Sequence, residues 1–146
     1  MAQGGHPMTR NRINLEIEIP TQTRYLGLIG NIGEQLAWDL IDYSGDRDVL
    51  AYNLNLVLTE ALSNVIKHAG CENQALRVCI SIEGNNLSIQ VHDKGLGFDL
   101  AGVISCPEPD DLCERGRGIF LIRQLMDSVD YRKTKMGNVL EMKKKL

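Results

Sequence analysis

The chain has 146 residues, 43% of them hydrophobic and 24% charged, which excludes intrinsic disorder and fibrous architecture and predicts a folded domain. The net charge of −3 disfavours a nucleic-acid surface, and charge or glycine interrupts every apolar stretch before the ~18 residues that cross a bilayer. We therefore expect no direct contact with nucleic acid or membrane. The four cysteines show no C-x-x-C spacing and are typical of reduced thiols in a cytoplasmic protein. Residues 1–7 precede a second methionine and look like a leader, so we place one domain at 8–146.

The N-terminal part of the domain predicts one strand and two helices. Apolar and polar residues alternate at 12–19 and stop at Pro20, which is typical of a half-buried strand. Apolar residues at three- and four-residue intervals predict an amphipathic helix at 23–43. A second helix follows the break at 44–46 and ends near Gly70, because glycine suits a helix C-terminus.

The C-terminal part predicts a hairpin, a loop, a helix and two strands. Two alternating segments within 78–91 flank a turn at 84–86, which predicts a β-hairpin. Residues 99–115 contain two prolines and several acidic residues without an apolar period, and long loops of this kind are usually functional or mobile. The last expected elements are a helix at 118–127 and strands at 129–133 and 138–143.

The second predicted helix carries Glu60, Asn64 and Lys67 on one face, because 100° per residue places Asn64 about 40° to one side of Glu60 and Lys67 about 20° to the other. An asparagine oxygen is a hard neutral ligand suited to Mg²⁺, and a carboxylate one turn away can accept a proton from an attacking hydroxyl or water. A solvated polar face would show the same pattern. The spacing by itself therefore leaves both interpretations open.

A second motif, Asp93-x-Gly95-x-Gly97, follows the predicted hairpin. The glycines let the backbone turn sharply and approach a ligand, and the carboxylate can accept a hydrogen bond from an exocyclic amine. An ordinary Asx or glycine turn is the alternative.

The third motif, Arg115-Gly116-x-Gly118, leaves the long loop and opens a helix. Such a helix start offers free backbone N–H groups to phosphate oxygens, and the guanidinium can bind them as well. A flexible helix entry without ligand is the alternative.

The three motifs in this order resemble the ATP-binding boxes of the GHKL superfamily. Within it, TEALSNVIKHA at 59–69, VHDKGLGFD at 91–99 and ERGRGIFLIRQLMD at 114–127 are similar to bacterial anti-sigma factor serine-protein kinases of the stress-response and sporulation type. The resemblance runs from about Ile13 to the C-terminus. It implies an α/β fold, a two-layer α/β sandwich of the Bergerat type, with a mixed sheet, helices on one face, and the nucleotide between the helices and the loop.

The resemblance also implies roles for single residues. Glu60 becomes the general base toward a serine hydroxyl, Asn64 the Mg²⁺ ligand, and Asp93 the acceptor for adenine of ATP. The residues that it implies around the nucleotide and its phosphates are Gly95, Gly97, Arg115, Gly116, Gly118, Lys67 and His68.

The implied substrate is a serine on an anti-sigma antagonist protein, with a sigma factor as a second partner and a homodimer as the assembly. Two departures from the family pattern stand out. Residues 28–30 read Leu-Ile-Gly where these kinases usually carry an arginine that helps hold the protein partner, so this departure concerns the sigma factor as partner. The second departure is Gly137-Asn138, which stands where the family often has Gly-Thr before the last strand.

Two other functions remain open at this point. One is a module that uses ATP only to order its loop and sequesters a partner, although a pure binder has no use for a base at Glu60. The other is a detached ATPase domain of a histidine kinase, although we expect no dimerisation helix pair with a phosphoacceptor histidine before it.

Overall fold

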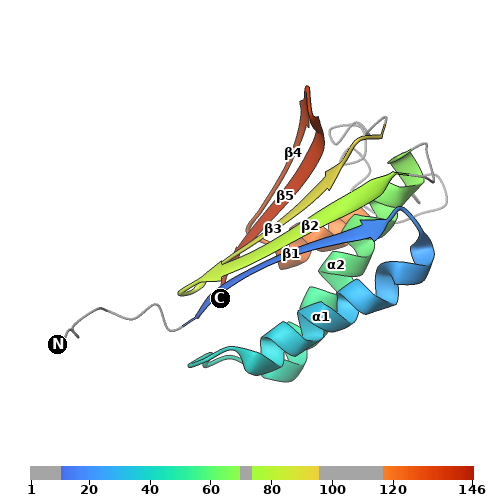
Figure 1. Cartoon of the computed structure of the whole chain (residues 1–146). Coiled ribbons are helices and arrows are strands. Elements are labelled where there is room, and N and C mark those ends of the chain that lie inside the picture. Colours follow the sequence, from blue (N-terminus) through green and yellow to red (C-terminus); the bar gives the residue numbers. More distant parts are fainter. Residues whose placement is uncertain (1–10, 70–73, 96–116) are drawn as a thin grey trace.

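The computed structural model describes residues 11–69, 74–95 and 117–146. Its elements in chain order are β1 (Arg12–Pro20), a 3-10 turn η1 (Thr23–Tyr25), α1 (Leu26–Asp39), α2 (Arg47–Ala69), β2 (Ala75–Glu83), β3 (Asn86–Asp93), α4 (Arg117–Leu125), β4 (Ser128–Thr134) and β5 (Gly137–Lys145). Figure 1 shows one twisted sheet whose helices all lie on the same face. This is the expected two-layer α/β arrangement.

The sheet has five described strands in the order β1-β2-β3-β5-β4, and every neighbouring pair is antiparallel. The expectation of a mixed sheet is therefore wrong. The chain passes from β3 through α4 to β4, so β3 and β4 do point the same way. However, the hairpin return of β5 occupies the position between them, which separates the two parallel strands.

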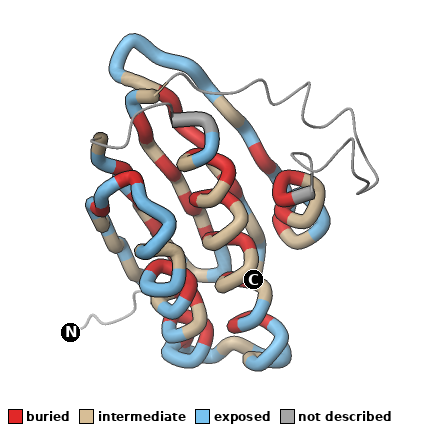
Figure 2. The backbone as a smooth tube through the Cα atoms, turned by 90° about the vertical axis from the view of Figure 1, so that its right-hand side faces the viewer, coloured by how far each residue is buried: buried red, intermediate tan, exposed pale blue. Residues whose placement is uncertain are grey.

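The inner face of the sheet and one side of each helix form the core. Side chains alternate along β2 and β3 between buried and more exposed positions, as the period of two predicts. Figure 2 shows the buried residues gathered between the sheet and the helices. The inward apolar side chains of β2 and β3 are Leu76, Val78, Ile80, Ile82, Leu87, Ile89 and Val91.

The hairpin between β2 and β3 turns on a two-residue loop whose first residue, Gly84, has a φ of 62°. Glycine adopts this left-handed conformation without steric cost, so the local sequence is enough to place the turn.

The first helix ends at Asp39, four residues before the predicted end. Leu40 is extended, with φ −63° and ψ 133°. The Arg47 guanidinium donates to the carbonyl oxygen of Leu40 at 2.6 Å and to two more at the helix end, and the Asn11 side chain exchanges two hydrogen bonds with the backbone of Ile41. These hydrogen bonds satisfy the last carbonyl groups of α1. They also hold the residues after the helix against the sheet, so the apolar spacing in the sequence continues beyond the end of the helix.

Helix α2 lies at the centre of the helical layer. Two glycines of α1 let the helices approach closely, since a Cβ at Gly33 would lie 2.6 Å from Cδ1 of Leu58 and one at Gly30 would lie 2.8 Å from Oδ1 of Asn55. By length and composition the segment Arg47–Lys67 of α2 could cross a membrane, but half of its 18-residue apolar stretch is buried inside this fold. Its apolar composition therefore serves the core.

Candidate functional site

The first part of the site joins α2 to the start of α4. Glu60 and Asn64 are one turn apart on α2, and Gly118, the second residue of α4, lies against both side chains. A Cβ at Gly118 would lie 2.7 Å from Oε2 of Glu60 and 2.8 Å from Nδ2 of Asn64. The fold thus brings residues of the first and third sequence motifs into contact, and only a glycine leaves their polar atoms undisturbed.

Asn64 is the residue best suited to hold a ligand here. It is only 5% exposed, and its Nδ2 has no hydrogen-bond partner within the described ranges. A buried amide atom without a partner costs about 1–3 kcal/mol, so its presence points to a ligand. A 180° turn of the amide presents Oδ1 instead, which is an oxygen ligand suited to Mg²⁺. The donor set at Glu60 and Asn64 therefore fits this cation.

The second part of the site lies at the end of β3. Asp93 is 6% exposed, and its Oδ1 accepts hydrogen bonds from the backbone N–H of Gly95 at 2.8 Å and from Nδ2 of Asn138 at 3.1 Å. Its Oδ2 has no partner among the residues that the structure describes. The motif is thus an Asx turn that is held through one of the two carboxylate oxygens.

Residues 37–144, which include both parts of this site, match the family model of the histidine kinase-like ATPase domain. The chain belongs to this family. The two-layer fold and the resemblance stated from the motifs are therefore confirmed, while the roles of single residues stay predictions.

Several curated proteins are similar to this ATPase-family chain over most of its length. The serine-protein kinase RsbW of Halalkalibacterium halodurans is 28% identical over 141 residues, covering 89% of this chain and 82% of the relative. The protein of the same name from Oceanobacillus iheyensis is 27% identical, covering 79% and 76%. That of Bacillus cereus is 24% identical, covering 79% and 74%.

Asn138 is a site residue that the sequence interpretation treated only as a departure from the family pattern. It is buried, lies directly opposite Asp93 in the β3–β5 register, and its Nδ2 also donates to the carbonyl oxygen of Gly95 at 2.9 Å. It therefore holds both ends of the Asx turn. The alternation along the strand could have revealed it, because Asn138 is a polar residue on the same inward face as Leu140 and Met142.

Gly137, just before it, requires glycine for two reasons. Its φ is 131°, and a Cβ would lie 2.4 Å from the carbonyl oxygen of Asp93. The β4–β5 turn can approach the end of β3 only without that Cβ.

The remaining predicted residues of this ATPase-family site are placed only in part. Lys67 is exposed on α2, on the same helical face as Glu60 and Asn64. The side chain of His68 lies outside the described residues. The same holds for Gly97, Arg115 and Gly116 and for the loop predicted at 99–115.

Proposed function

We propose that this ATPase-family protein is a protein-serine kinase: it binds ATP with Mg²⁺ and transfers the γ-phosphate to a serine of an anti-sigma antagonist protein. Phosphate transfer would control how the protein sequesters a sigma factor. The protein would act as a homodimer in the cytoplasm. The names of its relatives, serine-protein kinase RsbW, support the reaction class. The observation that carries the proposal is the contact of Glu60, Asn64 and Gly118.

The residues divide the binding of the nucleotide between two ends. Oδ2 of Asp93 would accept a hydrogen bond from the exocyclic amine of adenine, while Oδ1 keeps the turn in shape through Asn138. Oδ1 of Asn64 would ligate Mg²⁺, which neutralises charge on the phosphate oxygens when it is bound. The backbone N–H groups at the start of α4 would face those oxygens beside Gly118.

Glu60 supplies the proton acceptor. As the serine oxygen bonds to the γ-phosphorus, the bond to the leaving oxygen of ADP breaks, and the carboxylate of Glu60 takes the hydroxyl proton. Its neighbour Asn64, one turn along α2, would keep the phosphate and the base at a fixed separation because both side chains stand on one rigid helix.

Two substitutions separate base from ligand. Glu60→Gln preserves size and hydrogen bonding but removes the base, so we expect turnover to fall by about 10²–10⁴ with nearly unchanged ATP affinity. Asn64→Ala removes the metal ligand, so both Mg-ATP affinity and rate should fall. Transfer of label from ATP to the serine of a partner protein measures the rate, and calorimetry measures the affinity.

The sequestering module is the second candidate, and the same experiment addresses it. Wild-type transfer by Glu60→Gln would exclude Glu60 as the base. Tight partner binding without phosphate transfer by the unmodified protein would favour the ATP-ordered module.

A further inference from the structure

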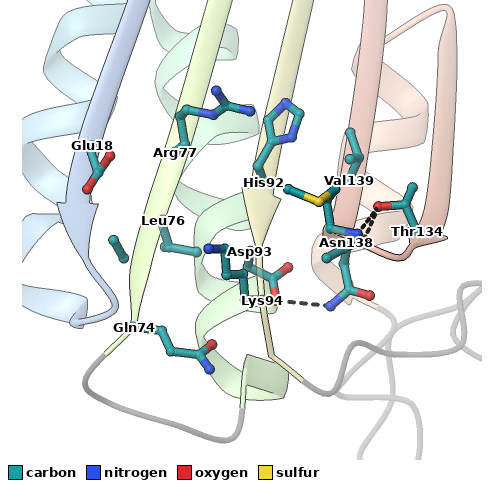
Figure 3. A pocket seen from close by; sticks show the side chains of 13 residues that line it. Glu18, Gln74, Leu76, Arg77, His92, Asp93, Lys94, Thr134, Asn138 and Val139 are labelled. Carbon is teal, nitrogen blue, oxygen red and sulfur yellow. Dashed lines mark hydrogen bonds between the residues drawn. The ribbon is translucent and has the colours of Figure 1, made fainter.

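A hollow of about 710 Å³ opens on the face of the sheet that carries no helices, at the end where β2 and β3 adjoin the Asx turn. Figure 3 shows side chains from β1, β2, β3 and β5 around it. Glu60 and Asn64 do not line this hollow, but Asp93 and Asn138 do, so it adjoins the adenine end of the proposed nucleotide site.

One row of cross-strand neighbours forms the wall of the hollow. Glu18 is paired with Arg77, Arg77 with His92, and His92 with Val139, and all four side chains point away from the helices. Figure 3 shows the guanidinium of Arg77 and the ring of His92 side by side. Cationic and apolar groups therefore stand next to each other at one surface.

The two cations that line the hollow are not held in strong ion pairs with other described residues. The ion pair of Arg77 is a 3.5 Å contact to Glu16, with side chains 47% and 64% exposed, and such exposed pairs contribute little. Lys94 is exposed and has no ion-pair partner in the part of the chain that the structure describes. Glu18 and Asp93 are the acidic groups that line the hollow, and Oδ1 of Asp93 already accepts two hydrogen bonds within the turn.

The pKa of His92 reflects first its burial and then the cations beside it. Burial lowers the pKa of His92, and the charges of Arg77 and Arg132 lower it further against the smaller opposing effects of Glu16 and Glu141. These four charged groups come from the four strands around β3 in the sheet. An anion bound beside His92 would relieve the repulsion between the cations.

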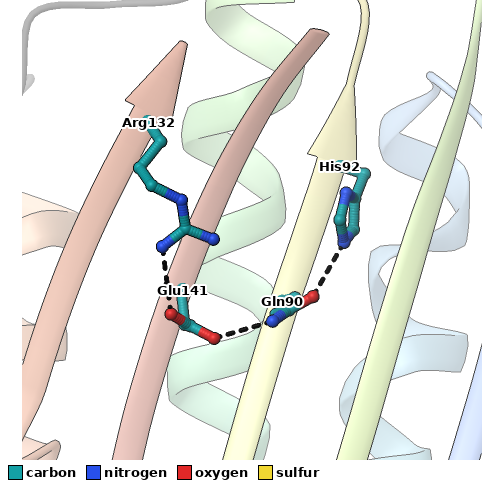
Figure 4. A network of polar contacts seen from close by, with 4 residues as sticks. All are labelled: Gln90, His92, Arg132 and Glu141. Atoms are coloured by element: carbon teal, nitrogen blue, oxygen red, sulfur yellow. Dashed lines mark hydrogen bonds and ion pairs between the residues drawn. The ribbon is translucent and has the colours of Figure 1, made fainter. Parts of the chain in front are cut away.

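A chain of hydrogen bonds fixes the ring of His92 (Figure 4). Arg132 donates to Oε1 of Glu141 at 3.1 Å, and Nε2 of Gln90 donates to Oε2 of Glu141 at 2.7 Å. Gln90 therefore presents its amide oxygen to His92, and the Nε2–H of His92 donates to it at 2.9 Å. Nδ1 is left without a partner among the described residues, so it can take up a proton and donate to an oxyanion.

We propose that this hollow binds a phosphate group, with Arg77, Lys94 and protonated His92 donating to its oxygens. Arginine matches phosphate through two parallel N–H donors, and the other two groups add charge. The volume far exceeds that of a free phosphate ion, and Val139 and Met136 line it with apolar surface. The occupant is thus a phosphate monoester on a small organic or peptide body, which includes a phosphoserine segment. This proposal does not depend on the kinase activity.

The test is an NMR titration of the histidine rings at constant ionic strength. The probes are inorganic phosphate, a capped phosphoserine peptide, and sodium chloride as the control for screening. The nucleotide site is saturated with a non-hydrolysable ATP analogue. We expect both phosphate probes to shift the His92 signals saturably and to raise the pKa of His92, with the peptide binding more tightly than the free ion.

Two arginine variants separate local binding from general electrostatics. Arg77 and Arg132 both lower the pKa of His92, but only Arg77 lines the hollow. Arg77→Gln and Arg132→Gln should therefore both raise that pKa without phosphate. Only Arg77→Gln should weaken phosphate binding, by about tenfold or more, since a charge-assisted pair is worth roughly 1.5–3 kcal/mol. Glu18→Gln should strengthen binding.

Three results would overturn the proposal. One is an equal shift of His92 with chloride, which would mean screening only. Another is a response confined to His68 and absent at His92, which would place the phosphate at the nucleotide side. The third is equal weakening of binding by both arginine variants.

Discussion

Replacing Gly118 by alanine tests whether Glu60 and Asn64 form one site with the start of α4. The new Cβ would lie 2.7 Å from Oε2 of Glu60 and 2.8 Å from Nδ2 of Asn64, whereas ordinary contact begins at 3.4 Å. Both atoms are at the ends of flexible side chains. We therefore expect the two side chains to turn aside by about the missing 0.6–0.7 Å while the backbone stays in place.

The expected effects on stability and on rate differ. Alanine is favoured over glycine in a helix by about 1 kcal/mol, and overpacking costs about 1–3 kcal/mol, toward the lower end where neighbours can move. The two effects largely cancel, so the free energy of unfolding should stay within about 1 kcal/mol of wild type. A displacement near 1 Å at reacting groups costs up to about a hundredfold in rate. Phosphate transfer by Gly118→Ala should therefore fall by roughly tenfold to a hundredfold.

Gly27→Ala is the matched control, because Gly27 is also the second residue of its helix and a Cβ there meets nothing within 4 Å. It should gain up to about 1 kcal/mol in stability and keep wild-type activity. Urea unfolding measures stability, and label transfer from ATP measures rate. If Gly118→Ala turned over like Gly27→Ala, Gly118 would not shape the site; if it lost more than about 3 kcal/mol, its role would be structural.

Three further predictions concern other parts of the fold. Gly33→Ala would place its Cβ 2.6 Å from Cδ1 of Leu58 and should cost about 1–3 kcal/mol in urea unfolding; unchanged stability would mean that the helices separate freely. Asn138→Val removes the donor to Asp93 and should weaken ATP binding in calorimetry by about tenfold, whereas Asn138→Thr should keep more of it. Because burial lowers the pKa of His92, the unfolded chain binds its proton more readily, so stability should decline as pH falls below about 6.5. His92→Gln should flatten that decline in urea unfolding at pH 7.5 and 5.5, and an identical slope in both proteins would assign it to other groups.

Local patterns in the sequence determined the order of the elements and the direction of most side chains. Alternation predicted β1 and the hairpin of β2 and β3, because a period of two reports directly which face of a strand is buried. The same reasoning placed Glu60 and Asn64 on one face of α2. The Asx turn at Asp93 was also visible, since it needs only a carboxylate and an N–H two residues apart.

Only the tertiary structure decided what those elements meet. Three features join residues that are far apart in the chain. They are the position of β5 between β3 and β4, the end of α1 with its hydrogen bonds to Arg47 and Asn11, and the contact of Gly118 with Glu60. No local period encodes such a contact, because its free energy depends on packing and chain closure across the whole domain. For the same reason Asn138 counted as a mild departure in the sequence and became, once β5 lay beside β3, the residue that holds Asp93 in place.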